Sequence, residues 1–149
     1  MAETLSQTSW ADHARAVLVQ AGHQRGGARD AIIDVLAAQS CALSALEIED
    51  RLRAGERHVG RASVYRALDL LQGHGLIARL DLGDSVSRFE LVDPAGGHHH
   101  HLVCDSCGSL VPFDDADLER SIDRLSRRLG FSAVGHEVVL RGDCGACRN

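Results

Sequence analysis

The chain has 149 residues, a net charge of −5 and 44% hydrophobic residues. This length suits one medium domain or two small ones, and the charge excludes a globally basic nucleic-acid binder but not a local basic patch. No stretch approaches the roughly 18 consecutive apolar residues of a membrane span. Residues 1–18 lack the basic-then-apolar order of a signal peptide. We therefore expect a cytoplasmic protein that does not enter a membrane.

Helices are predicted in the first third of the chain. A first helix is predicted at 10–21, ending near Gly22, and apolar residues at helical spacing predict a second helix at 28–39. Ser44 and Glu47 have the spacing of a capping box, which predicts that a third helix begins at about residue 44. Its apolar contacts are predicted to be Leu46, Ile48 and Leu52.

A fourth helix and a hairpin follow. The helix is predicted at 61–75, because apolar residues recur there at helical spacing. Apolar residues alternate on both sides of Gly83 and Asp84, which is typical of a β-hairpin. A winged helix-turn-helix has this order of elements: three helices, a fourth helix turned against the third, and then a hairpin. The predicted core line of the fourth helix is Val64, Leu68 and Leu71.

A basic patch coincides with this helix-turn-helix. Residues 51–66 hold five arginines and one glutamate, which is +4 inside an acidic protein. Arginine pairs with guanine edges, and serine, tyrosine and arginine also reach phosphates, so an exposed face of these residues suits a recognition helix in a major groove. The commoner alternative is a solvated charged helix face. The predicted DNA contacts are Arg61, Ser63, Tyr65 and Arg66, with backbone contacts from Arg25 and Arg29.

The clearest linker is Asp-Pro-Ala-Gly-Gly at 93–97. It predicts a winged-helix DNA-binding domain at 1–92, a hinge at 93–97 and a metal-binding domain at 98–149. In the last of these, two short strands surround a Cys-x-x-Cys, a helix covers 114–130 and a strand returns at 131–142. The fold class is therefore α+β, with an N-terminal winged helix-turn-helix followed by a small α/β domain.

Two Cys-x-x-Cys pairs carry the strongest chemical signal, Cys104 with Cys107 and Cys144 with Cys147. Each pair spans a tight turn that aims two thiolates at one point. In a reducing compartment such pairs are metal ligands rather than disulfides. Four thiolates form the tetrahedral shell of a structural Zn²⁺ and leave no open position for catalysis.

Four consecutive histidines, 98–101, precede the first cysteine pair. In an extended chain alternate side chains point to opposite faces, so the run can supply two metal sites. His99 and His101 would share one face, and His98 and His100 the other. The alternatives are a solvated loop or a tag remnant. Partners for the two faces are predicted among Cys41, Glu90, Glu119 and His136.

No arrangement typical of an enzyme is found. The sequence has no nucleophile–base set, phosphate loop or paired carboxylates in a credible cleft. A zinc hydrolase would need an open metal position beside a glutamate base, and only His99, His101 and Glu90 could imitate that. We therefore expect that the protein is not an enzyme.

Several motifs together resemble the ferric uptake regulator superfamily. They are SVYRALDLLQGHGLI, DSVSRFELV, HHHHLVCDSCG and CGAC, and the resemblance covers roughly residues 14–148. It implies a homodimeric, metal-dependent transcriptional regulator, usually a repressor, that binds a double-stranded DNA operator. It also implies that the C-terminal α/β domain is the dimerisation domain.

The resemblance further implies three metal sites. The structural Zn²⁺ matches Cys104, Cys107, Cys144 and Cys147. The regulatory site at the hinge matches His99, His101 and Glu90. The additional site in the dimerisation domain matches His98, His100, Glu119 and His136.

Departures from the family pattern bear on the metal. Many iron and peroxide sensors have a histidine before the third helix, and here Ala42 aligns with it while Cys41 lies one position earlier. We expect Cys41 to be the fourth regulatory ligand, because a sulfur-containing shell favours zinc. Pro112 replaces a carboxylate of peroxide sensors. The expected function is thus a zinc-responsive repressor of metal-uptake genes. The alternatives are an iron- or peroxide-responsive repressor, with Fe²⁺ in place of Zn²⁺ at the regulatory site for an iron sensor, or a zinc-stabilised protein-interaction module.

Overall fold

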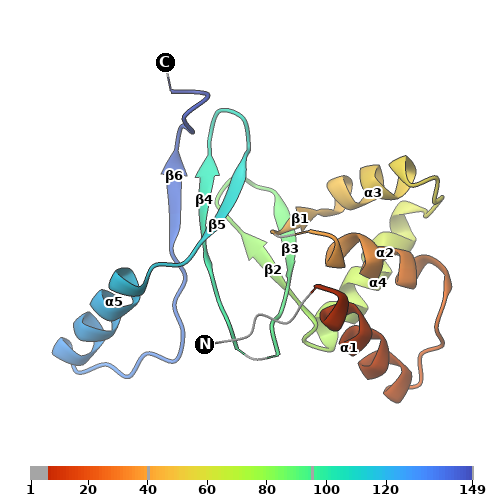
Figure 1. Ribbon diagram of the computed structural model, residues 1–149, viewed down its shortest axis with the longest axis horizontal. Helices are drawn as coiled ribbons and strands as arrows, with labels where there is room; N and C mark the ends of the chain where they lie inside the picture. Colours follow the sequence, from red (N-terminus) through yellow and green to blue (C-terminus); the bar gives the residue numbers. More distant parts are fainter. Residues whose placement is uncertain (1–6, 40, 95, 149) are drawn as a thin grey trace. The chain divides into compact units, whose positions relative to one another are not determined.

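The chain forms two compact units, Met1–Gly97 and His98–Asn149. The computed structural model describes residues 7–39, 41–94 and 96–148 (Figure 1). Residues 1–6 of the predicted DNA-binding domain, its residue 40, hinge residue 95 and residue 149 lie outside the described residues. Within the described ranges, no helix combines the length and the hydrophobicity needed to cross a membrane.

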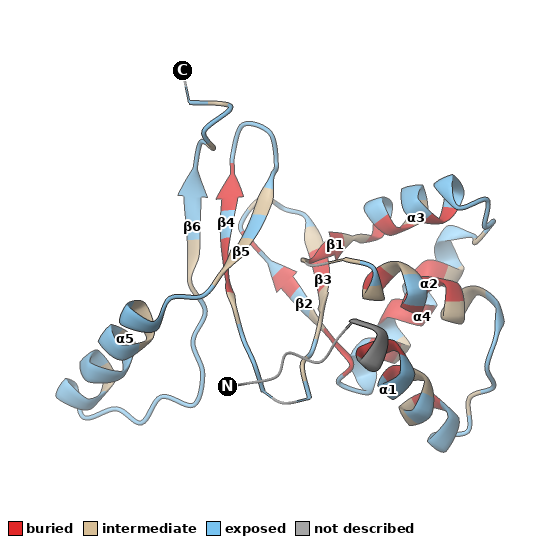
Figure 2. Ribbon diagram, in the orientation of Figure 1, coloured by how far each residue is buried: buried red, intermediate tan, exposed pale blue. Residues whose placement is uncertain are grey.

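Four helices build most of the first unit, and they confirm the predicted helices to within a few residues. They are α1 (Gln7–Gln20), α2 (Gly27–Ala37), α3 (Ala45–Ala54) and α4 (Arg61–Gly73). α2 packs against the other three, and the buried sides of the helices form one hydrophobic core (Figure 2). The largest side chains of this core include Ile32, Ile33, Ile48, Leu52, Val64, Leu68 and Leu71.

The start of α3 is held by the predicted capping box. The Glu47 backbone N–H donates to Ser44 Oγ at 3.2 Å, and the Ser44 N–H donates to Glu47 Oε2 at 2.7 Å. Such a cap contributes about 1 kcal/mol. The prediction that Leu46 contacts the core is wrong, since its side chain is 58% exposed. Ile48 and Leu52 lie one turn apart on the buried side of α3, and Leu46 lies off that line.

A three-stranded sheet completes the first unit. β2 (Ile77–Asp81) and β3 (Ser87–Leu91) pair antiparallel, which confirms the hairpin. Gly83, with φ of +82°, gives the turn a left-handed residue at little steric cost. β1 (Leu43–Ser44) was not predicted, and it pairs with the other side of β3 to give the order β1-β3-β2. The sheet thereby connects the start of the helix-turn-helix to the wing.

The second unit contains a second three-stranded sheet and one helix. Its elements are β4 (His100–Cys104), β5 (Leu110–Phe113), α5 (Ala116–Arg128) and β6 (Val139–Gly142). β4 is central, antiparallel to β5 and parallel to β6. The returning strand predicted at 131–142 begins only at Val139, because the ladder with β4 begins there.

α5 has a side-chain cap at its N-terminus, and none of its side chains is fully covered by the rest of the described chain. Asp115 is its N-cap residue and accepts a hydrogen bond from the Leu118 N–H at 2.8 Å. None of its residues is buried, and Figure 2 shows it without any red segment. Leu125 is 45% exposed and Leu129, just after the helix, 70%. An apolar stripe on an exposed helix indicates a surface that is covered by a partner.

Candidate metal centres and nucleic-acid interface

Two turns bring the four paired cysteines together. Cys104 ends β4 and pairs in register with Gly142 of β6, so the turns that follow the two parallel strands lie at the same end of the sheet. The four Sγ atoms lie within 4.8 Å of one another, and those of Cys107 and Cys144 are 3.8 Å apart. A tetrahedron with Zn–S bonds of about 2.3 Å has edges of about 3.8 Å. The cluster therefore fits a four-coordinate Zn²⁺.

The thiols of this cluster differ in acidity. The Cys144 backbone N–H donates to Cys104 Sγ at 3.3 Å, and this hydrogen bond and others lower the pKa of Cys104 to about 6. Hydrogen bonds with the Cys144 and Cys107 thiols, and then partial burial, raise the pKa of Cys147 to about 12. The lowered pKa favours the thiolate form of Cys104, and the raised pKa favours the thiol form of Cys147, which must give up its proton to bind a cation. Metal binding at this cluster must release protons and weaken as the pH falls.

The histidine run presents two pairs of rings, as its alternation predicted. The ring centroids of His98 and His100 are 5.1 Å apart, and those of His99 and His101 are 4.9 Å apart. His100 and His101 belong to β4, and the other two immediately precede it. One short segment therefore presents potential metal ligands at two different places.

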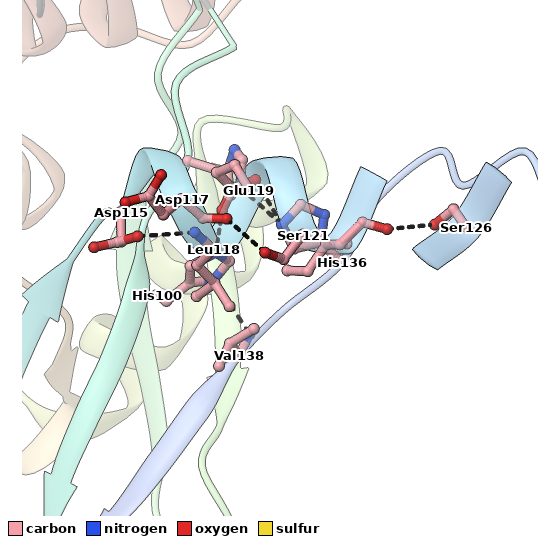
Figure 3. Close-up of polar contacts among 11 residues, drawn as sticks. His100, Asp115, Asp117, Leu118, Glu119, Ser121, Ser126, His136 and Val138 are labelled. Atoms are coloured by element: carbon pink, nitrogen blue, oxygen red, sulfur yellow. Dashed lines mark hydrogen bonds and ion pairs between the residues drawn. The ribbon is translucent and has the colours of Figure 1, made fainter. Parts of the chain in front are cut away.

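The first pair meets Glu119 and His136, which brings together the predicted set of four. Figure 3 shows His100, Glu119 and His136 of this set. Glu119 lies in the first turn of α5, and His136 lies in the loop before β6 rather than on a strand. Nε2 of His100 is 2.6 Å from Glu119 Oε1, and Nε2 of His136 is 2.9 Å from Oε2. Hydrogen bonds from His100 and then His136 lower the pKa of Glu119. Three imidazoles and a carboxylate suit a divalent transition metal.

One hydrogen bond at this cluster bears on metal binding. The Val138 N–H donates to Nδ1 of His100 at 3.2 Å, so neutral His100 carries its proton on Nε2, toward Glu119 (Figure 3). A metal on Nε2 would displace that proton and leave Nδ1 protonated. Binding through His100 therefore requires the Val138 contact to change, whereas His98 and His136 already present Nε2 atoms 3.4 Å apart.

Cys41 and Glu90 lie on neighbouring segments of the first unit. Leu43 of β1 pairs with Phe89 of β3. Cys41 precedes Leu43 by two residues, and Glu90 directly follows Phe89, so the unpredicted β1 brings the chain around Cys41 alongside the strand of Glu90. The other two predicted regulatory ligands, His99 and His101, belong to the second unit. Their union with Cys41 and Glu90 in one site is a proposal.

The exposed side of α4 carries the predicted DNA contacts. Val64 is buried, while Tyr65 and Arg66 are exposed and Ser63 is partly exposed. Arg66 Nη2 donates to Ser63 Oγ at 3.1 Å, which directs the guanidinium along the helix surface. This face presents arginine donors beside an exposed phenol ring, which suits a helix that reads the major groove.

A polar pocket of about 450 Å³ joins this face to the segment between α1 and α2. Arg29 Nη1 donates to the Gln24 carbonyl at 3.2 Å, which ties the start of α2 to the preceding loop. Several arginines around one hollow favour an anion such as a DNA phosphate. Of the six predicted DNA contacts, the pocket brings together Arg25, Arg29, Ser63 and Arg66.

Arg61, the first residue of α4, is engaged within the protein. Its Nε and Nη2 atoms donate to the two carboxylate oxygens of Glu49 on α3, at 2.9 and 3.2 Å. This pairing keeps Glu49 ionised and lowers its pKa. Glu49 was missed in the sequence analysis, because twelve residues and a turn separate it from Arg61 and no short-range spacing signals the contact.

These features define a class of protein. A winged helix-turn-helix with a basic face, joined to an α/β unit that carries ligand clusters, is the architecture of a metal-dependent DNA-binding regulator. Residues 20–141 match the Ferric uptake regulator family. The chain belongs to this family of metal-responsive transcriptional regulators.

Known relatives include regulators named for different metals. The chain is 36% identical over 106 residues to the ferric uptake regulation protein of Bordetella parapertussis, with 71% of this chain and 75% of that protein covered. It is also 36% identical over 109 residues to the zinc uptake regulation protein of Mycobacterium tuberculosis, with 71% and 80% covered. The structure of the Vibrio cholerae ferric uptake regulator matches with a TM-score of 0.77 at 30% identity, covering 89% of this chain and all of that one.

Proposed function

We propose that the protein is a zinc-responsive repressor of metal-uptake genes. Relatives named for iron and for zinc have the same identity to this chain, so overall similarity does not select the metal. The choice of zinc rests on Cys41, whose thiol belongs to the segment alongside the strand of Glu90. A thiolate, two imidazoles and a carboxylate form a softer shell than nitrogen and oxygen alone, and such a shell favours zinc.

The regulatory metal acts as a cross-link in this proposal. Cys41 and Glu90 belong to the first unit, and His99 and His101 to the second. A metal that binds all four restrains a hinge at 93–97, and it changes DNA affinity through its preference for one arrangement of the units. Metal and DNA binding are then reciprocally coupled. The structural rearrangement of the DNA-binding domains in the Vibrio cholerae regulator supports a mechanism in which the arrangement of the two units changes.

The proposed homodimer uses the second unit. Leu102 pairs in register with Val111 on one side and Leu140 on the other, and these three side chains are 40%, 47% and 50% exposed. They form an apolar row across the sheet, and the apolar stripe of α5 adds to the exposed surface. A second copy that covers these side chains would remove apolar area from water. It would also provide two recognition helices for two half-sites.

The two remaining metal clusters have different roles in the proposal. The four cysteines hold a permanent Zn²⁺ that stabilises the second unit. The cluster of His98, His100, Glu119 and His136 holds the additional metal and ties α5 to the start of β4. Neither cluster needs a ligand from the first unit, so both act independently of the hinge.

Adding metals back one at a time tests the proposed metal. After mild chelation that leaves the cysteine-bound zinc in place, we expect Zn²⁺ to restore DNA binding at a lower free concentration than Fe²⁺, Mn²⁺ or Ni²⁺. DNA binding is measured by fluorescence anisotropy on a duplex taken from the upstream region of a metal-uptake gene. Restoration by Fe²⁺ and not by Zn²⁺ would establish an iron sensor of the same family and overturn the zinc assignment.

Replacing Cys41 with serine tests the fourth ligand. Changes to residues that only support the ligands already lower metal affinity by about tenfold or more. Loss of a ligand itself should lower it at least as much. We therefore expect Cys41→Ser to need at least tenfold more free Zn²⁺ for half-maximal DNA binding. Binding at saturating metal should largely recover if His99, His101 and Glu90 still hold the ion. An unchanged Zn²⁺ titration would remove Cys41 from the site.

A further inference from the structure

The contact between Glu49 and Arg61 is asymmetric in exposure. The Glu49 side chain is 10% exposed, whereas the Arg61 side chain is 70% exposed. The carboxylate is therefore held in the protein, and the guanidinium extends from it toward solvent. An exposed ion pair between two mobile side chains contributes little, but here one partner is fixed and the contact is bidentate. Such a contact restrains the orientation of the arginine plane.

The contact uses one edge of the guanidinium and leaves another available. Arginine has five N–H donors in one plane. Glu49 receives donors from Nε and Nη2, the side of the guanidinium. The end edge, formed by Nη1 and the second hydrogen of Nη2, still offers two parallel donors. Two parallel N–H groups match the O6 and N7 acceptors of guanine in the major groove.

The position of Arg61 favours a base over a phosphate. It is the first residue of α4, and Tyr65 lies one turn further on the exposed side. In helix-turn-helix proteins the N-terminal residues of the recognition helix reach base edges. A phosphate can also accept from two parallel N–H donors, so the preference for a base rests on the N-terminal place of Arg61 in α4 and on the negative charge of Glu49, which repels the phosphate backbone. Arg25 and Arg29 already provide charge around the neighbouring pocket.

We propose that Glu49 is a positioning residue that binds the Nε and Nη2 side of the Arg61 guanidinium. The free end of the guanidinium, Nη1 and Nη2, then pairs with a guanine in each half-site. The inference rests on the proposed DNA-binding function and adds one specificity determinant to it. Glu49 does not touch DNA. It restricts the rotamers of Arg61 before binding, which reduces the ordering cost at the correct base. Its negative charge disfavours the phosphate backbone, so its removal does not weaken binding to unselected DNA.

The test is selection from a duplex library with a randomised core, using the zinc-loaded full chain. We expect the wild type to select guanine at one position of each half-site. In competition binding, Arg61→Ala should lower the preference for that guanine about tenfold, as loss of a bidentate base contact does. Glu49→Ala should lower it several-fold and Glu49→Gln less, because glutamine retains one acceptor. Affinity for unselected duplex should not fall in either Glu49 variant.

A matched control separates orientation from charge. Asp50→Asn removes the same charge from the neighbouring exposed position of α3, where Asp50 pairs with Arg53 at 3.0 Å. It should leave the guanine preference unchanged. The double variant Glu49→Ala with Arg61→Ala should be no less selective than Arg61→Ala alone, since Glu49 acts through Arg61.

Two results would overturn the positioning role while leaving the DNA-binding function intact. One is an unchanged guanine preference in Glu49→Ala. The other is an Arg61→Ala variant that weakens all duplexes equally with a smaller salt dependence, which indicates a phosphate contact. If the zinc-loaded wild type enriches no sequence and binds no duplex, the DNA-binding function itself fails, and the role of Glu49 fails with it.

Discussion

Serine in place of Cys144 is expected to unfold the second unit and release its tightly held zinc. Among the described residues from 98 to 148, the buried apolar side chains are only Val103 and Cys104. A unit with so small a core depends on a metal or on a partner chain for its stability. Structural zinc contributes about 10–16 kcal/mol of binding free energy in small zinc domains. That is about the entire stability of an ordinary domain.

The consequences can be measured separately. After dialysis, mass spectrometry should show less zinc per protomer in Cys144→Ser than in the wild type, and the difference should equal the one ion that the four cysteines hold. Size-exclusion chromatography should show loss of the dimer, and the thermal unfolding transition of the second unit should disappear. The first unit should still unfold cooperatively, because its own core of helices is intact.

Cys41→Ser is the matched control for this experiment, since it also removes one thiol. Cys41 lies outside the cluster of four, and its loss should leave the tightly held zinc and the unfolding of the second unit unchanged. A Cys144→Ser variant that remains dimeric and keeps this zinc would contradict the structural role of the cluster.

Local patterns predicted a large part of this molecule. The capping box of Ser44 and Glu47 requires only three residues of sequence separation, and it has the expected hydrogen bonds. The alternation of the four histidines follows from the pleat of an extended chain, and the two ring pairs agree with it. The sequence correctly indicated each of the five helices among the described residues, α3 from its capping box and α4 from apolar residues at helical spacing.

Features that depend on distant partners were missed. β1 has two residues, too few for any periodicity, and it exists because β3 offers a free edge. The loop of His136 was predicted as strand because its apolar residues resemble one, but the ladder with β4 begins only at Val139. Leu46 is apolar yet exposed, because hydrophobicity alone does not fix which side of α3 is buried. Glu49 and Arg61 meet across a turn, which no residue spacing signals.

Arg66→Ala is expected to weaken sequence-specific DNA binding strongly while the fold is retained. Arg66 is exposed on α4, lines the basic pocket and contacts the protein through Ser63. Removing it leaves the core residues Val64 and Leu68 in place. Loss of a bidentate arginine–base contact costs about 1–3 kcal/mol, and a homodimer loses two such contacts. The dissociation constant on a selected duplex should therefore rise about 30-fold or more, measured by anisotropy at fixed salt and saturating Zn²⁺.

The control for charge is Arg127→Ala. Arg127 is 77% exposed on α5, where it pairs with Asp123 at 2.5 Å. This variant removes the same charge from the second unit and should leave DNA binding within about twofold of the wild type, since Arg127 is not among the predicted DNA contacts and its exposed charge is screened by salt. Unaltered DNA binding by a folded Arg66→Ala would make the recognition-helix assignment wrong. Absence of DNA binding in the wild type itself, at every metal tested, would favour a helix-turn-helix that contacts protein.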